Sequence, residues 1–409
     1  MSDPDWMKHR GFALRLAGRT VSRSEFASLI ASARARLERQ GLAQGDRIAI
    51  ELTPSAESLA LLFGALAIGA LVCPLSAQLG SLERAARIKR LSPRLVLSET
   101  SCEQFPPGPK SPWPGSMLFF TSGTTAEPKL ALLSLQGLLH SAAVASEALD
   151  LREEDEWLLS LPLHHVGGLG IVLRCLVSGA TLSMDARQCT HISYVPTQLH
   201  RAWPVGKRLR CLLLGGAPIR EVPPPLPIVC SYGMTETGSL VLKSRQAPPF
   251  LGEPLRGTEL RIASDGELFV RGASLFQGYW QNGVVETPFD EAGWFGTRDL
   301  SAWDANKGYA IVGRKDNQFI SGGENIQPEE IERALCTHPA VIDAVVVPQD
   351  DAEWGARPVV FLCAQEPLTL SEVRDFLSER LARYKLPVAV FEWPESEGKP
   401  NRRMLSRQV

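Results

Sequence analysis

The strongest constraint on the fold is an alternation of apolar strand-like runs and amphipathic stretches along the first half of the chain. Residues 24–40 carry apolar side chains at helical spacing and stop at Gly41, which predicts an amphipathic helix. Strand and helix patterns then alternate through 47–52, 55–69, 70–74, 82–91, 95–98, 156–161, 168–177, 192–195 and 210–214. Such alternation is typical of parallel sheets covered by helices, so we predict an α/β fold for this region.

The pattern changes after Tyr232. Residues 259–262 and 267–270 flank Ala263-Ser-Asp-Gly266, a hairpin signal, and predict a β-rich lobe at 250–310. A boundary is expected near Gly313-Arg-Lys-Asp316. Beyond it, helical patterns at 328–336 and 371–381 and apolar strands at 341–347 and 358–363 predict a compact α+β unit.

Bulk composition narrows the class of protein. A chain of 409 residues is long enough for two or more domains, and its net charge of −2 gives no reason to expect nucleic acid or an anionic membrane as a partner. Its eight cysteines form no C-x-x-C pair, which favours buried free thiols in a reducing compartment. We find neither a signal-peptide pattern nor an apolar run long enough for a membrane span, so a cytoplasmic location is expected.

Residues 117–129 are the clearest candidate for a binding loop. The apolar run Met117-Leu-Phe-Phe120 leads into Thr121-Ser-Gly-Thr-Thr-Ala-Glu-Pro-Lys129. Hydroxyls and backbone N–H groups can donate to a polyphosphate, Gly123 lets the backbone approach closely, and the lysine supplies positive charge. The spacing differs from the G-x-x-x-x-G-K-[ST] loop. Taken alone, this stretch fits an ordinary polar surface turn equally well.

Four further features carry a functional and a structural interpretation. Thr235-Glu236 fits a nucleotide and metal site or a plain helix N-terminus, and Lys399 fits a catalytic cation or one of several solvated charges. Arg174 lies in the otherwise apolar stretch 168–177, where it needs an anionic partner unless it snorkels to the surface. His164 and His165 are an unpromising metal pair, because adjacent side chains are expected to point apart.

The ordered motifs together resemble the acyl-adenylate-forming superfamily of acyl- and aryl-CoA synthetases, luciferases and peptide-synthetase adenylation domains. They are Thr121 to Lys129, Leu214-Gly-Gly-Ala-Pro218, Tyr232-Gly-Met-Thr-Glu236, Gly293-Trp-Phe-Gly-Thr-Arg-Asp299, Gly313-Arg-Lys-Asp316, Ser321-Gly-Gly-Glu-Asn-Ile-Gln-Pro-Glu-Glu330 and Gly398-Lys399. Within it, the segments at 161–170, 189–199 and 278–283 are similar to the o-succinylbenzoate–CoA ligases of menaquinone biosynthesis.

The resemblance implies a fold and a reaction. The fold is a large α/β N-terminal domain at 1–313, with two helix-covered sheets and a β-rich lobe, a hinge at 314–317, and a small mobile α+β C-terminal domain at 318–409. The implied reaction joins a small carboxylic acid, o-succinylbenzoate, to coenzyme A, with ATP and Mg²⁺, through an acyl-adenylate. Self-association into a homo-oligomer is left open.

The resemblance also assigns roles to individual residues. The phosphate loop would comprise Thr121, Ser122, Gly123, Thr124, Thr125 and Lys129. The adenine, ribose and α-phosphate site would comprise Gly215, Gly216, Ala217, Tyr232, Thr235, Asp299 and Arg314. Glu236 would bind Mg²⁺, and Lys399 would act in adenylation. The acyl pocket would be bordered by His165, Arg174, Gly216 and Ala217, with Arg174 facing a second substrate carboxylate. Asp316 would be the hinge, and Gly322 and Gly323 would line the tunnel for coenzyme A.

Three departures from the family pattern keep alternatives open. Ala126 stands where glycine is usual, Gly167 replaces a small polar residue, and Pro400 follows the lysine in place of an apolar residue. The alternatives are a synthetase for another aromatic or medium-chain acid, or a non-catalytic nucleotide-binding protein on the same fold.

Overall fold

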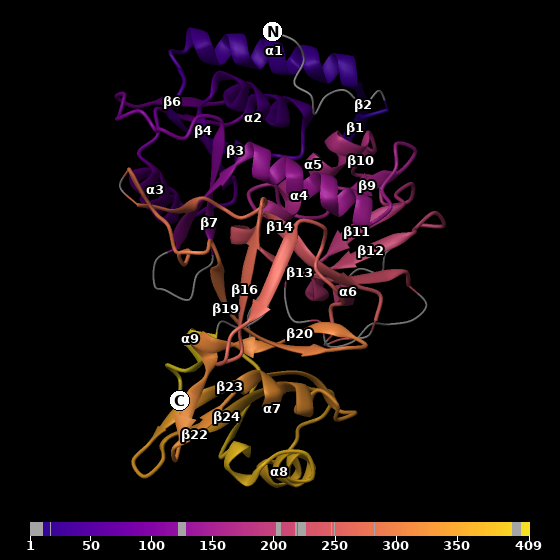
Figure 1. The fold of residues 1–409 in the computed structure, drawn as a ribbon, viewed down its shortest axis with the longest axis vertical. Coiled ribbons are helices and arrows are strands. Elements are labelled where there is room, and N and C mark those ends of the chain that lie inside the picture. The colour runs from indigo at the N-terminus through magenta and orange to yellow at the C-terminus, as the bar shows by residue number, and fades with distance from the viewer. Residues whose placement is uncertain are drawn as a thin grey trace.

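A computed structural model of the chain describes residues 11–16, 18–121, 128–201, 206–216, 219, 226–246, 248, 250–281, 283–394 and 402–409. The molecule is elongated (Figure 1), with the N-terminal two-thirds of the chain at one end of the long axis and the C-terminal part at the other. In this view the C-terminal elements lie below strand β20 (Gly308–Arg314).

The first large sheet has parallel strands at its centre and antiparallel strands at its edges. Its order over the described residues is β14-β13-β12-β11-β9-β10-β1-β2. The strands are β1 (Ala13–Leu16), β2 (Arg19–Ser22), β9 (Glu156–Leu158), β10 (Thr181–Ser183), β11 (His191–Tyr194), β12 (Cys211–Leu214), β13 (Ile228–Met234) and β14 (Ser239–Ser244). The β13–β14 pair, which is antiparallel, carries a register shift between Tyr232 and Gly233.

The second large sheet has the order β18-β17-β8-β7-β4-β3-β5-β6. Its strands are β3 (Arg47–Leu52), β4 (Leu71–Ser76), β5 (Leu95–Leu97), β6 (Cys102–Gln104), β7 (Ser116–Thr121), β8 (Lys129–Ser134), β17 (Gly278–Gln281) and β18 (Val284–Glu286). The predicted parallel pairing holds for β5, β3, β4 and β7. It is wrong for the edges, where short connections fold strands back as hairpins.

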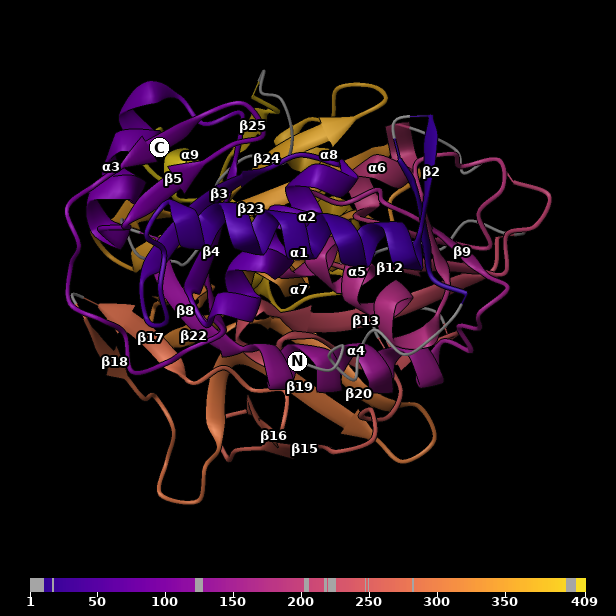
Figure 2. The ribbon, with the colours of Figure 1, turned by 90° about the horizontal axis from the view of Figure 1, so that it is seen from above.

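Helices fill the space between the two sheets. These are α1 (Arg23–Arg39), α2 (Ala56–Ile68), α4 (Leu135–Ala148) and α5 (Val166–Ser178). One continuous core joins them to both sheets, including Phe26, Leu62, Trp157 and Val172. Helix α2 is apolar nearly all round because it is buried on most sides. Figure 2 shows α1 and α2 lying alongside each other at the top of the molecule.

The outer faces of the two sheets are covered differently. Helix α3 (Ser81–Leu91) covers the second sheet, and α6 (Pro196–Arg201) packs on the first. The lobe sheet has the order β15-β16-β19-β20, from β15 (Thr258–Ile262), β16 (Glu267–Gly272), β19 (Phe295–Asp304) and β20 (Gly308–Arg314). The predicted hairpin is confirmed as β15–β16, and Ile311 of β20 packs against the first sheet.

The C-terminal part has hydrophobic cores of its own. Its elements are β21 (Phe319–Ser321), β22 (Glu324–Ile326), α7 (Pro328–Leu335), β23 (Val341–Asp351), β24 (Gly355–Ala364), α8 (Leu370–Ser378), β25 (Val390–Glu392) and α9 (Arg402–Leu405). Helices α7 and α8 pack on the β23-β24-β25 sheet through Ile331, Val346 and Leu377. Among the described residues, every helix is too short or too polar to cross a membrane.

Candidate active site

The predicted phosphate loop is anchored by an antiparallel hairpin. Strands β7 and β8 pair in register, so that Thr121 lies opposite Lys129. The Thr121 hydroxyl is buried and donates to the Lys129 carbonyl over 3.4 Å, whereas the lysine side chain is exposed. The other predicted loop residues, Ser122, Gly123, Thr124 and Thr125, lie outside the described residues, as does Ala126.

The predicted metal ligand, Glu236, and the predicted phosphate lysine, Lys129, contact the same tyrosine. Glu236 is 7% exposed and sits in a short 3₁₀ turn, Thr235–Thr237, between β13 and β14. Its Oε1 accepts a hydrogen bond from the Tyr279 hydroxyl over 2.9 Å. The Lys129 ammonium lies 4.5 Å from the centre of the Tyr279 ring. Burial raises the pKa of Glu236, and the tyrosine hydroxyl and the charges of Arg314 and Lys129 oppose that rise.

Tyr232, Asp299 and Arg314 form a second cluster from three different strands. Asp299 accepts a hydrogen bond from the Tyr232 hydroxyl over 2.6 Å and one from Arg314 over 2.9 Å. Burial raises the pKa of Asp299, and Arg314 acts in the opposite direction. The pKa of Tyr232 lies well above its ordinary value, chiefly because the phenol is buried and then because Asp299 is close. A carboxylate held by two donors is a ready acceptor for hydroxyl groups.

Two glycines follow β12 at positions that disfavour a side chain. A Cβ on Gly215 would lie 2.2 Å from the Ser231 hydroxyl oxygen, and Gly216 has φ +76°. Both positions therefore favour glycine, for packing in the first case and backbone conformation in the second. Ala217, predicted beside them, lies outside the described residues.

Arg174 is a buried cation without a carboxylate partner among the described residues. It is 2% exposed, so the alternative of a snorkelling arginine is wrong. Its guanidinium donates to the Ser239 hydroxyl over 2.8 Å and lies 5.3 Å from the centre of the Trp157 ring, while its Nε has no hydrogen-bond partner. Burial lowers the pKa of Arg174 to about 10. Ser239 adopts φ +126°, an unusual conformation for a serine.

The two histidines lie next to each other, contrary to the expectation that they point apart. Their ring centres are 4.3 Å apart, because α5 begins directly after His165 and the chain turns there. Partial burial lowers the pKa of His164 to about 4, with the positive charges of His165 and Arg87 adding to the effect. The pKa of His165 is also lowered by partial burial and by Arg87. Within the described residues, no cluster of three His, Cys, Asp or Glu side chains could hold a metal ion.

The predicted hinge is held by ion pairs in this orientation. Asp316 accepts from Arg298 over 2.6 Å and from Arg314 over 3.3 Å. The neighbouring Lys315 pairs with Glu267 of β16 over 2.8 Å. Arg298 has φ +64°, which is an unusual conformation for a residue other than glycine. These contacts connect the start of the C-terminal unit to the lobe sheet.

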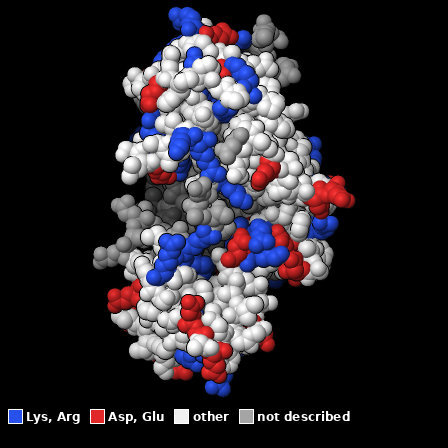
Figure 3. Space-filling model, turned by 90° about the vertical axis from the view of Figure 1, so that its left-hand side faces the viewer, with Lys and Arg blue, Asp and Glu red and all other residues white. Residues whose placement is uncertain are grey.

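The predicted tunnel glycines both have positive φ, +59° at Gly322 and +84° at Gly323. A Cβ on Gly322 would lie 2.2 Å from the Trp354 ring, whereas the space around Gly323 is open. Lys399 and Pro400 lie outside the described residues. On the face drawn in Figure 3, Lys and Arg side chains gather above and below the junction of the two parts.

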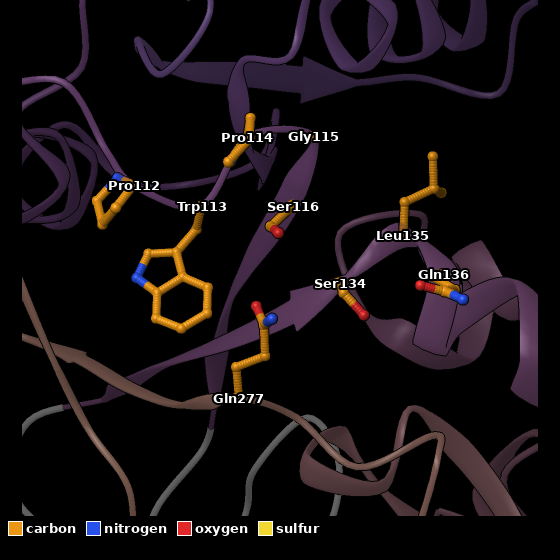
Figure 4. Close-up of a pocket in the computed structure, with 9 residues that line it drawn as sticks. All are labelled: Pro112, Trp113, Pro114, Gly115, Ser116, Ser134, Leu135, Gln136 and Gln277. Atoms are coloured by element: carbon orange, nitrogen blue, oxygen red, sulfur yellow. The ribbon is translucent and has the colours of Figure 1, made fainter.

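A separate pocket lies at the start of β7, the end opposite to Thr121 (Figure 4). It is lined by residues that include Trp113, Ser134 and Gln277. Its lining includes none of the predicted site residues that the structure describes. Tyr279 is a candidate site residue that the sequence analysis does not predict, although its segment, 278–283, is similar to the o-succinylbenzoate–CoA ligases.

Comparisons with known proteins place these features in context. A model for the AMP-binding enzyme family matches residues 8–111 and 101–280, and one for its C-terminal domain matches 330–400. The 2-succinylbenzoate–CoA ligase of Escherichia coli is 34% identical, covering 94% of this chain and 91% of its own. Two Bacillus subtilis o-succinylbenzoate CoA synthetase (MenE) structures are each 26% identical. The complex with the acyl-adenylate intermediate has a TM-score of 0.82 and coverages of 99% and 98%. The complex with ATP and magnesium has a TM-score of 0.80 and coverages of 95% and 96%.

Proposed function

Because the chain belongs to the AMP-binding enzyme family, we propose that it is an ATP-dependent ligase that joins o-succinylbenzoate to coenzyme A. In the first half-reaction, a carboxylate oxygen of the acid bonds to the α-phosphorus of ATP and pyrophosphate leaves. In the second, the coenzyme A thiol attacks the acyl carbon, and the bond to AMP breaks. Both half-reactions develop negative charge, so positioned cations and hydrogen-bond donors supply most of the catalysis.

The choice of o-succinylbenzoate as the acid rests on Arg174, whose buried charge has no carboxylate partner among the described residues. A buried cation is costly unless it meets an anion, and the structure gives this one a hydroxyl and an aromatic ring but no carboxylate among the described residues. A diacid leaves one carboxylate free when the other is activated. The free carboxylate of o-succinylbenzoate is the anion we assign to Arg174.

The nucleotide would bind across the two clusters in the large domain. Thr121 and Lys129 would hold the β- and γ-phosphates, with the adjoining loop residues Ser122 to Thr125. Asp299 and Arg314 would bind the ribose beside Tyr232, Thr235 would donate to the α-phosphate, and Gly216 would leave room for adenine and the acyl group. These roles follow from the family motifs, and the proximity of Glu236, Lys129 and Arg314 supports them.

Glu236 fits a magnesium ligand. Its carboxylate is buried and shares Tyr279 with Lys129, and Mg²⁺ usually takes one or two carboxylates together with substrate phosphates. Bound magnesium supplies charge neutralisation on the phosphate oxygens. The protein's part is to hold the carboxylate in place.

The C-terminal unit would act as the moving part. We assign residues 1–313 to the large domain, 314–317 to the hinge with its pivot at Asp316, and 318–409 to the lid. Lys399 would approach the α-phosphate in the first half-reaction. Rotation would then withdraw it and bring Gly322 and Gly323 to the thiol tunnel beside His165. The separate hydrophobic cores of the C-terminal unit support movement as a rigid body.

A matched pair of acids tests the assignment. Pyrophosphate release is measured with o-succinylbenzoate and with 4-oxo-4-phenylbutanoate, the same skeleton without the ring carboxylate. We expect the diacid to be used at least tenfold more efficiently, the scale of one charge-assisted contact. Preferential use of the monoacid would show a synthetase for another acid. Tight AMP binding with no acid-dependent pyrophosphate release would show a non-catalytic binding protein.

A further inference from the structure

Tyr279 joins two groups that arrive from different parts of the chain. Its hydroxyl donates to Glu236 Oε1 over 2.9 Å, and its ring lies 4.5 Å from the Lys129 ammonium. Glu236 comes from the turn between β13 and β14, and Lys129 comes from the first position of β8. One side chain thus contacts both the carboxylate and the lysine by different chemical groups.

The backbone fixes Tyr279 at this position. Strand β17 pairs antiparallel with β8, and Tyr279 lies opposite Ala131, two residues after Lys129. On the other side, the backbone N–H of Phe276 donates to the Glu236 carbonyl over 2.8 Å. The segment that leads into β17 is therefore hydrogen-bonded to the turn that carries the carboxylate. Phe276 also packs edge-on against the tyrosine ring, with centres 4.9 Å apart.

Each contact leaves its partner able to bind a ligand. A carboxylate oxygen that accepts one hydrogen bond keeps a second lone pair, and the other oxygen is not used by Tyr279. The aromatic face attracts the ammonium through its quadrupole and does not neutralise it, as a carboxylate would. The lysine thus keeps its full charge for an anion.

We propose that Tyr279 is a positioning residue that holds Glu236 for the metal ion through its hydroxyl and Lys129 for the phosphates through its ring. This role rests on the proposed function, since it concerns ATP and Mg²⁺ at the same site. Partners of this kind fix the orientation of a metal-binding carboxylate, and their loss commonly weakens metal binding by about 10–100-fold.

The two contacts can be separated by two substitutions. Tyr279→Phe keeps the ring under Lys129 and removes the hydroxyl, whereas Tyr279→Leu removes both. Tyr309→Phe is the matched control, because that hydroxyl donates over 3.3 Å to the Leu260 carbonyl within the lobe sheet. The readout is the dissociation constant of MgATP, and of ATP with EDTA, by isothermal titration calorimetry without any carboxylic acid.

We expect Tyr279→Phe to raise the dissociation constant of MgATP by about tenfold or more while changing that of metal-free ATP by less than about twofold. Tyr279→Leu should raise the metal-free constant as well, by about three- to tenfold, the scale of a cation–π contact. Thermal unfolding of both variants monitors the fold. If Tyr279→Phe binds metal-free ATP more tightly than Tyr279→Leu does, the weaker binding of the leucine variant comes from the missing ring and not from general damage to the fold.

The results that overturn the proposal are distinct from those that overturn the function. If Tyr279→Phe binds MgATP as tightly as Tyr309→Phe does, the hydroxyl has no positioning role. If the two Tyr279 variants weaken metal-free ATP binding equally, the ring has none. If the wild-type protein binds neither form of ATP, the proposed function is wrong, and the role of Tyr279 is refuted with it.

Discussion

Replacing Arg174 with leucine should separate a binding charge from a structural one, because the two roles predict opposite effects on stability. Burial lowers the pKa of Arg174 to about 10, and this shift means that the fold disfavours the charged side chain by about 3 kcal/mol. Leucine removes that cost and forfeits the hydrogen bond to Ser239 and the contact with Trp157, each worth about 1 kcal/mol. We therefore expect the free energy of unfolding to stay the same or to rise by about 1 kcal/mol.

Catalysis should change in the other direction. Loss of a charge-assisted contact of about 1.5–3 kcal/mol lowers kcat/KM for o-succinylbenzoate by about 10–150-fold. The same substitution should leave kcat/KM for 4-oxo-4-phenylbutanoate unchanged, since that acid has no second carboxylate. Arg174→Lys keeps a charge but not the planar fork. Its kcat/KM for o-succinylbenzoate should therefore lie between those of the wild-type protein and Arg174→Leu.

Urea unfolding gives the free energy of unfolding, and steady-state pyrophosphate release on the same preparations gives kcat/KM for each acid. A leucine variant that loses more than about 2 kcal/mol of stability and keeps its preference for the diacid would mean that Arg174 supports the fold and not the substrate. Equal losses with both acids would point to a distorted pocket. Either outcome contradicts the assignment of this charge to a substrate carboxylate.

Three further predictions follow from the structure and the family motifs. Because the pKa of His164 falls from 6.5 to about 4, the unfolded chain binds the proton more readily, so stability should decline as the pH falls from 6.5 toward 4. His164→Asn should remove about 1 kcal/mol of the loss between pH 6.5 and 5, and an unchanged pH slope in urea unfolding would contradict this. Gly322→Ala should lower the free energy of unfolding by about 2–4 kcal/mol, because the new Cβ meets the Trp354 ring. The control Gly323→Ala should lower it by about 1 kcal/mol, and equal losses in thermal unfolding would refute the steric argument. Lys399→Ala should slow adenylation by about 10²–10³-fold and leave thioester formation from supplied acyl-adenylate unchanged. If single-turnover assays show that only thioester formation is lost, Lys399 does not act in adenylation.

Local sequence patterns predicted those parts of the fold that depend on neighbours in the chain. The strand before the phosphate loop, the β15–β16 hairpin and the amphipathic α1 each follow from a periodicity or a turn signal that lies within one segment. Gly216 is expected only from the resemblance to the family, and the structure gives it a positive φ that favours glycine. Element boundaries differ by one to a few residues, where flanking backbone joins a ladder that the pattern alone does not reveal.

The parts that sequence patterns missed depend on pairing between distant segments. Tyr279 and Glu236 are 43 residues apart, and their contact exists because β17 joins β8 at the edge of a sheet. The antiparallel edges have the same origin, since apolar runs reveal burial but not strand direction. The histidine pair illustrates a third case, in which a helix start brings adjacent rings together against the usual expectation.

The candidate site uses aromatic rings to support the cations that we assign to ligands. Lys129 lies over Tyr279 and Arg174 over Trp157, whereas Arg314 pairs with the carboxylates of Asp299 and Asp316. A carboxylate would stabilise either cation more strongly, but an incoming phosphate or substrate carboxylate would then have to compete with it. A ring face holds the cation in position and leaves its charge available. This difference is a physical reason to assign anion binding to Lys129 and Arg174, and a hydroxyl-binding carboxylate, held by Arg314, to Asp299.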